Sequence, residues 1–263
     1  MGLLAEDGHV VEVAPRGQPP RLSLNRVGRH RATTFTGLCA QHDAEMFRAL
    51  DSEQLDPENP EHLFLLAYRA VMREHHVLRR GEEMMRRAAA LPQLSGRTSH
   101  DYFGDVARSF SRYRSRYFES AFRDSDFDSL ESRVVEIETS SATVAVSSLY
   151  SLDLLTRPDR DIARAALSVV PLSQHRSIAV ISCVTDDLHL LEPELARVLD
   201  DDAHGLPLRL SHLILETSEN FVLRPGFTEQ WSSRKKRKIV KAAGLLSALH
   251  SVPDDDELML FDL

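Results

Sequence analysis

The stretch PEHLFLLAYRAVMREHHVLRRGEEMMRRAAA, Pro60 to Ala90, carries the clearest structural signal in the sequence. Its apolar residues recur three and four positions apart, which is the spacing of one face of an α-helix. The residues on that face are Leu63, Leu66, Ala67, Ala70, Val71, Val77 and Leu78. Pro60 suits a helix start, because the first turn does not use the N–H group that proline lacks. We therefore predict one long helix, within a helical first half of the chain.

Glu74 falls at the centre of this apolar face when the helix is projected at about 100° per residue. A lone carboxylate among apolar side chains costs roughly several kcal/mol unless it is paired or protonated. We therefore expect a specific partner for it: an arginine, a histidine, a helix N-terminus or a metal. Three interpretations stay open. They are a buried ion pair between segments, a metal-binding or acid–base role, and a helix bend that exposes the side chain.

The flanking sequence changes in character along the chain. HVVEV and RLSLNRV, near the start, predict short strands, and residues 99–123 predict a second long helix. After Ser132, the β-branched run RVVEIETSSATVAVSSLYSL predicts two strands or one long bent strand. ALSVVPLS and RSIAVISCVT predict further strands, and three amphipathic segments beyond residue 185 predict helices. We expect the acidic tail VPDDDELMLFDL to be loose.

These elements predict an α+β protein. Its N-terminal half is helical with a short β-rich start, and its C-terminal half holds a mainly antiparallel sheet with flanking helices. The change in character suggests two regions, 1–128 and 129–263. No long flexible linker separates them, and 263 residues suit one large domain as well as two modest ones, so a single continuous domain stays open.

Bulk composition excludes several classes of protein. The chain is 42% hydrophobic and 27% charged, which is ordinary for a globular protein, and its net charge of −8 argues against an overall basic footprint for nucleic acid. Two cysteines do not make a disulfide framework. We see no signal peptide and no apolar run near the roughly 18 residues that span a membrane, so we expect a soluble, cytoplasmic protein.

A compact group of reactive side chains lies in TTFTGLCAQHDAEMF, residues 33–47. Cys39 and His42 form Cys-x-x-His, which is half of a tetrahedral zinc site. The alternative is that Cys39 is a small buried hydrophobe and His42 marks a helix start. Asp43 suits the first turn of such a helix, where its charge meets the positive end of the dipole. Helical projection also turns Asp43 toward Phe47 and the apolar side.

The basic run RKKRKIVK begins at Arg234, ends at Lys241 and contains all four lysines of the chain. Such a run is a candidate contact for a protein or for the phosphates of a nucleic acid. An apolar stripe that includes Ile239 and Val240 continues through it. A solvated face of an amphipathic helix is therefore the alternative.

The segments RATTFTGLCAQHDAEMFRALD, LLAYRAVMRE and LSHLILETSENFVLRPGFTEQW together resemble a family of uncharacterised bacterial proteins. That family carries a Thr-Phe-x-Gly-(Phe/Leu)-Cys-x-x-His-Asp motif, a Tyr-Arg-x-x-x-x-Glu helix and a Glu-Asn segment. The resemblance implies binding roles for Arg69, Glu219 and Asn220. It also implies a zinc site completed by an N-terminal Cys-x-x-Cys pair, which is missing from this sequence. Either the Cys39–His42 segment is a degenerate zinc knuckle, or the sequence begins at an internal start. For Asn220, termination of the preceding helix is the alternative.

Two classes of function follow. The first is a binding or interaction protein, with the Cys39–His42 segment as a structural knuckle and zinc as its possible ligand. The second is a metal-dependent hydrolase, such as a nuclease, in which Asp43 and Glu74 carry the catalysis and His42 helps to bind the metal. The first is favoured, because buried carboxylates also occur in structural ion pairs.

Overall fold

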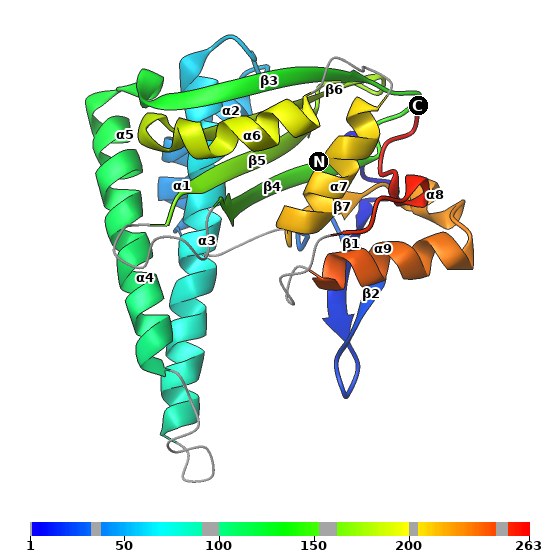
Figure 1. Cartoon of the computed structure of the whole chain (residues 1–263), viewed down its shortest axis with the longest axis horizontal. Coiled ribbons are helices and arrows are strands. Elements are labelled where there is room, and N and C mark those ends of the chain that lie inside the picture. The colour runs from blue at the N-terminus through cyan, green and yellow to red at the C-terminus, as the bar shows by residue number, and fades with distance from the viewer. Residues whose placement is uncertain (1, 33–37, 91–99, 153–161, 200–204, 246–251) are drawn as a thin grey trace.

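The computed structural model of the chain describes residues 2–32, 38–90, 100–152, 162–199, 205–245 and 252–263. It confirms the α+β class, with helices on both sides of one antiparallel sheet (Figure 1). The strands are β1 (His9–Arg16), β2 (Arg21–Gly28), β3 (Leu130–Glu138), β4 (Val144–Ser151), β5 (Arg164–Pro171), β6 (Arg176–Val184) and β7 (Phe221–Leu223). The helices are α1 (Ala40–Met46), α2 (Arg48–Ser52), α3 (Pro60–Ala89), α4 (His100–Arg114), α5 (Ser120–Asp124), α6 (Leu188–Val198), α7 (Leu206–Thr217), α8 (Pro225–Glu229) and α9 (Ser233–Leu245).

The long helix α3 is present as predicted and begins where the sequence indicates, but its predicted apolar face is only partly buried, since Val77 is 40% exposed. The Asn59 side chain caps it by accepting a hydrogen bond of 2.9 Å from the Glu61 N–H, and Pro60 occupies the first turn. The second predicted helix is also present as α4 and α5, joined by a π-helical turn, Ser115–Glu119. Phe64 and Tyr68 of α3 pack against Phe118 of that turn, with each pair of ring centroids 5.6 Å apart.

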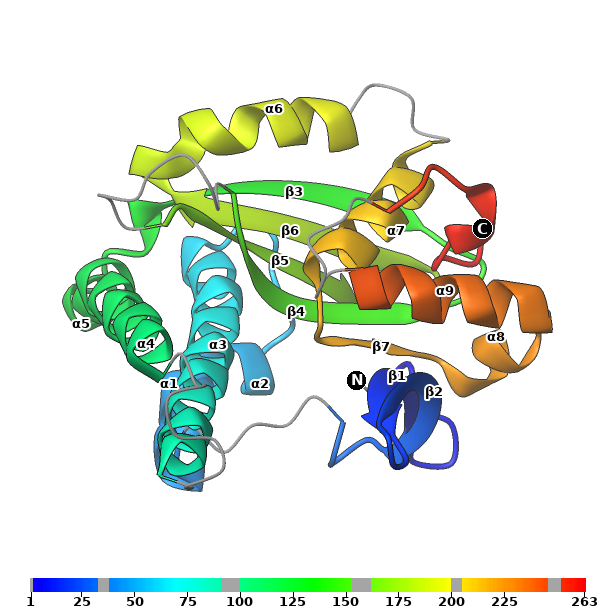
Figure 2. The same cartoon turned by 60° about the horizontal axis from the view of Figure 1, so that its bottom comes forward.

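The sheet has seven strands in the order β2-β1-β7-β4-β5-β6-β3. The β-branched run after Ser132 forms two strands, β3 and β4, which are not neighbours, because β5 and β6 lie between them. Helices α3 and α4 lie on one face, and α6, α7 and α9 on the other (Figure 2). Strands β5 and β6 are therefore buried along almost their whole length.

The N-terminal hairpin of β1 and β2 joins the rest of the sheet through β7. Only two residue pairs make this connection, Val11 with Leu223 and Glu12 with Val222. The sheet thus combines strands from both sides of residue 128, and the division of the chain at that point stays a prediction.

The prediction of a loose C-terminal tail is wrong. Leu258, Leu260 and Phe261 are buried in the same cluster as α6, α7 and α9. Backbone and side-chain hydrogen bonds attach this segment to the loop before β4: the Ser140 N–H donates to the Asp262 carbonyl at 2.7 Å, and the Thr143 hydroxyl donates to the Leu260 carbonyl at 2.7 Å. Two of its acidic residues, Asp255 and Glu257, pair with Lys238 of α9, while the apolar side chains complete the core.

None of the helices among the described residues combines the length and the apolar character that a membrane span requires.

Shortening the buried tail side chain should destabilise the whole protein. We expect Phe261→Ala to lower the free energy of unfolding by about 3–5 kcal/mol, because it leaves a cavity in the core. The matched control is Leu263→Ala, at a residue that is 60% exposed, which should change stability by less than about 0.5 kcal/mol. Urea denaturation of both variants measures this, and equal small effects would show that the tail is not part of the core.

Candidate functional site

The Cys39–His42 stretch begins a helix. Cys39 precedes α1 and is exposed, and its Sγ lies 3.3 Å from Nδ1 of His42, which is exposed as well. Asp43 lies in the first turn of α1 and is partly buried. Phe47, between α1 and α2, is fully buried and packs edge-on against Tyr68 of α3. This contact holds the stretch against the long helix.

Zinc binding at this turn stays a prediction. A structural zinc site needs four donors, and Cys39 and His42 supply two. Within the described residues, no group of three or more histidine, cysteine, aspartate or glutamate side chains is arranged to hold a metal ion.

Glu74 is partly buried, as its place on the apolar face of α3 predicts. Burial raises the pKa of its carboxyl, and the charge of Glu219 raises it further, whereas Arg73 and Arg164 oppose the shift. No described side chain forms an ion pair with Glu74 within 4.0 Å. Cys39, His42 and Asp43 are not among the groups that shift this pKa. The charged neighbours of Glu74 therefore come from α3, β5 and the segment before β7.

A cleft opens where β7 begins. Because β7 has three residues and pairs with β1 only as far as Glu12, β1 and the segment that leads into β7 separate beyond that point. The space between them and α3 has a volume of about 510 Å³, within the usual range for ligand sites. Its lining includes Glu12, Val13, Arg31, Arg73, Ser218, Glu219 and Asn220.

Arg73 is the unusual residue of this cleft. Burial lowers the pKa of its guanidinium, and the nearest opposing charges are those of Glu74 and Glu219. No hydrogen bond or close ion pair joins Arg73 to any described residue. A guanidinium carries five N–H donors, and leaving them unpaired away from water is costly. Arg73 is thus a partly buried cation on the cleft wall whose donors have no partner among the described residues.

Ser218 adds a second unpaired donor to the same wall. Its residue is 1% exposed, and its hydroxyl has no hydrogen-bond partner among the described residues. Buried hydroxyls in native proteins are nearly always bonded, so an unpaired one on a cleft wall suggests a place for a ligand atom. Ser218 caps the C-terminal end of α7, which directs the chain from that helix into the cleft.

Arg69, a predicted binding residue one turn earlier on α3, has a partner within the protein. Its guanidinium donates two hydrogen bonds of 2.9 Å to the carboxylate of Asp51, and it lies over the Phe47 ring at 4.4 Å. Both bonds leave from one guanidinium nitrogen, Nη2, so the charge of Arg69 is paired with that of Asp51. Arg69 therefore holds α2 against α3, while the donors of Arg73 have no partner among the described residues.

Glu219 and Asn220, the other predicted binding residues, both line the cleft. Glu219 is exposed, whereas Asn220 is buried, and its amide donates to the Ser147 carbonyl at 2.8 Å. Asn220 does not terminate α7, which ends at Thr217. Instead, its hydrogen bond to Ser147 extends the pairing of β7 with β4. Asn220 also lines a second cavity, which has a volume of about 440 Å³.

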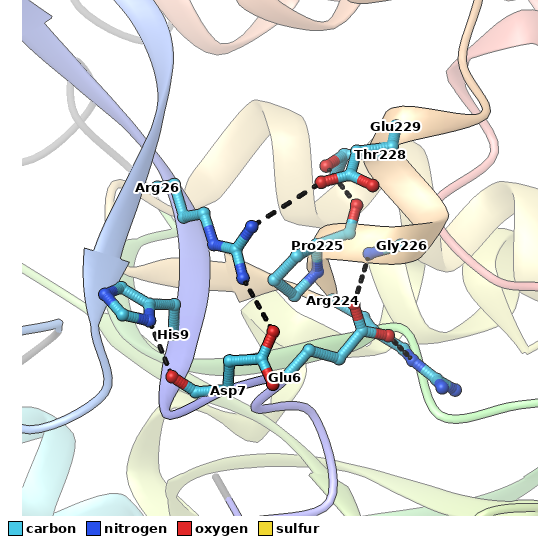
Figure 3. A network of polar contacts seen from close by, with 9 residues as sticks. All are labelled: Glu6, Asp7, His9, Arg26, Arg224, Pro225, Gly226, Thr228 and Glu229. Atoms are coloured by element: carbon cyan, nitrogen blue, oxygen red, sulfur yellow. Dashed lines mark hydrogen bonds and ion pairs between the residues drawn. The ribbon is translucent and has the colours of Figure 1, made fainter.

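A polar network joins the segment before β1, and strand β2, to the residues that follow β7 (Figure 3). The Glu6 carboxylate accepts hydrogen bonds from Arg224, just after β7, at 2.5 Å and from the Gly226 N–H at 2.7 Å. Beside it, Arg26 of β2 lies 3.6 Å from Asp7 and 3.8 Å from Glu229. The hydrogen bond from Arg224 holds the pKa of Glu6 below its usual range. These contacts reinforce the short β1–β7 pairing.

The basic run from Arg234 to Lys241 lies in α9 and is partly occupied by the C-terminal segment. Lys238 pairs with Asp255 at 2.5 Å and also with Glu257. Lys235 donates to the Met259 carbonyl at 2.8 Å. A protein or nucleic-acid contact through this run stays a prediction, which now depends on the exposed part of α9, Arg237 and Lys241 in particular.

Comparison of the chain with protein-family models, curated proteins and solved structures finds no match. The family resemblance of the motifs therefore stays a prediction. The site is defined by its geometry alone.

Sequence reasoning identified the neighbours of the two key residues and missed the residues themselves. Arg73 lies between Arg69 and Glu74, and Ser218 directly precedes Glu219. The spacing of Arg69 and Arg73, four positions apart on one helix face, was the available signal for Arg73. Nothing in the sequence marks Ser218, because its lack of a partner depends on the fold.

Removing the Glu6 charge should weaken the protein in a pH-dependent manner. Because the folded-state pKa of Glu6 is lowered, its stabilisation is present above the unfolded pKa and lost as pH falls through the folded value. We expect Glu6→Gln to cost about 1 kcal/mol at pH 7 and progressively less toward pH 3, measured by urea denaturation.

The control for this prediction is Asp7→Asn, at the neighbouring carboxylate, which is 93% exposed. It should lose less than about 0.5 kcal/mol at any pH. Equal losses for the two variants would contradict a specific role for Glu6.

Replacing Glu74 by glutamine should have the opposite effect. Because its folded-state pKa is raised, the wild-type protein loses stability as pH rises through that pKa, and a neutral amide does not. We expect Glu74→Gln to raise the Tm at pH 8 more than at pH 4, measured by calorimetry. Glu83→Gln, on the same helix, is the contrasting control, since Arg87 and Arg86 lower the pKa of Glu83. A lower Tm for Glu74→Gln at pH 8 would indicate a stabilising ion pair instead.

Proposed function

We propose that this chain is a binding protein whose cleft between α3, β1 and β7 receives a small ligand that carries an oxyanion, either a carboxylate or a phosphate. The observation that carries the proposal is the half-buried Arg73 guanidinium without a hydrogen-bond partner among the described residues. An oxyanion would accept hydrogen bonds from the N–H groups of Arg73. Hydrogen bonds between two charged groups are stronger than those between neutral groups.

The surroundings of Arg73 support this function. Ser218 lines the same cleft, and its buried hydroxyl has no partner among the described residues, so it is a candidate donor to the second oxygen of the oxyanion. Glu12 and Glu219 also line the cleft, so an anion bound to the positive Arg73 would have negative carboxylates on the same lining. This arrangement favours a ligand held in one orientation over non-specific attraction of anions.

A hydrolase that uses Glu74 is the second candidate. The observation that favours it is the raised pKa of Glu74, which places its proton exchange closer to neutral pH, as a general acid or base requires. The hydrolase predicted from the sequence uses His42 and Asp43 together with Glu74. It requires those two side chains to lie close to Glu74. Binding is preferred, since the unpaired donors of Arg73 and Ser218 need a ligand but no reaction.

Loss of the guanidinium should abolish anion binding. We expect Arg73→Met, which keeps the length of the side chain, to weaken acetate and phosphate binding at least about tenfold, since each hydrogen bond to a charged group contributes about 1.5–3 kcal/mol. Ser218→Ala should weaken binding by a smaller factor. Titration followed by NMR, using the backbone amides of residues 218–221, measures both.

Arg80→Met is the matched control, because Arg80 lies on the same helix and is exposed. It should bind both anions as the wild type does. Unchanged affinity in Arg73→Met, or an equal loss in Arg80→Met, would contradict the proposed function.

A further inference from the structure

The second cavity, of about 440 Å³, differs in character from the cleft. It lies between α2, α3 and the sheet, and much of its lining is aliphatic. The aliphatic residues include Leu50, Leu55, Leu66, Val170, Pro171 and Val222. Its charged residues are Arg69 and Asp51, which satisfy each other. This cavity therefore offers an apolar surface without a free charge.

The two spaces are neighbours along α3. Asn220 lines both of them. Arg69, at the second cavity, and Arg73, at the cleft, are four residues apart, which corresponds to about 6 Å along a helix axis. A short hydrocarbon chain covers that distance. One small molecule can therefore contact both spaces.

We infer that the ligand is amphipathic, with an oxyanion head held by Arg73 and Ser218 and an apolar body in the second cavity beyond Asn220. This inference rests on the proposed function and adds the chemical class of the ligand. The shared chemistry of the head is an oxyanion, which an alkyl carboxylate and an alkyl phosphate both supply.

Charge and burial together favour this class over a wholly polar ligand. Arg73 provides donors for one anionic group, while the pairing of Arg69 with Asp51 leaves the second cavity without a free group for another. Apolar surface gains binding free energy when it leaves water, and ligand sites commonly combine an aliphatic wall with a few polar groups that fix orientation. The second cavity provides that wall, and Asn220 is held in place by its hydrogen bond to Ser147.

A series of straight-chain carboxylates tests this inference. We expect the Kd measured by calorimetry to fall from acetate through butyrate to hexanoate, by about fourfold for each methylene that is buried. Hexan-1-ol should bind far more weakly than hexanoate, because it lacks the charge that Arg73 requires. Comparison of hexanoate with monohexyl phosphate distinguishes the two kinds of head group.

Variants of the apolar wall provide the second arm of the experiment. Leu66→Ala should weaken hexanoate binding about tenfold and leave acetate binding unchanged. Leu63→Ala is the matched control, since Leu63 is also a partly buried leucine of α3 but does not line the second cavity. The carboxylate series on the wild-type protein needs no variant, so the test holds even if Leu66→Ala folds poorly.

The outcomes separate this inference from the proposed function. If acetate and hexanoate bind equally and both depend on Arg73, the apolar body is wrong and the anion-binding function stands. If Arg73→Met binds hexanoate as the wild type does, or if hexan-1-ol binds as well as hexanoate, both are wrong. A chain-length dependence that is unchanged by Leu66→Ala would place the apolar body elsewhere and overturn the inference.

Discussion

Strand β7 is three residues long, yet it lies inside a seven-stranded sheet and connects the N-terminal hairpin to the remaining strands. Two residue pairs with β1 are a weak connection for a hairpin. The hydrogen bonds of Glu6 with Arg224 and Gly226 reinforce it from one side. On the other side β7 begins only at Phe221, so β1 pairs with it no further than Glu12, and the cleft occupies the space beyond. The shortness of β7 thus accounts both for the role of the Glu6 hydrogen bonds and for the presence of the cleft.

The cleft concentrates polar groups that oppose folding. Arg73 and Ser218 line it without a hydrogen-bond partner among the described residues, and next to Arg73 in α3 burial raises the pKa of Glu74. Each of these costs stability, and each lies near the others although they come from α3 and the end of α7. Unfavourable groups that gather on one cleft wall are typical of functional sites, where ligand contacts satisfy what the protein leaves open. Arg69, one turn earlier on α3, differs from Arg73 in that its charge is paired with that of Asp51.

The secondary structure followed largely from local sequence patterns. Periodicity located α3 and its start at Pro60, and β-branched runs located β5 and β6. The order of the strands did not follow, because a strand's pattern contains no information about its neighbour. The tail shows the same limit: its acidic residues suggested a loose segment, whereas Leu260 and Phe261 complete the core of the α6–α9 side.

For the candidate site, the sequence by itself determined that Glu74 faces inward and that Glu219 and Asn220 are worth attention. Helical projection and motif composition suffice for such statements, since both depend on residues close together in the chain. Tertiary structure alone decided which arginine has a partner, because Arg69 pairs with Asp51 of α2, whereas Arg73 lines the cleft and pairs with none of the described residues. It also brought Ser218 beside Arg73, across the opening that β7 leaves in the sheet. The physical reason is that an unsatisfied hydrogen-bond donor is a property of the surroundings, and those surroundings come from segments far apart in the sequence.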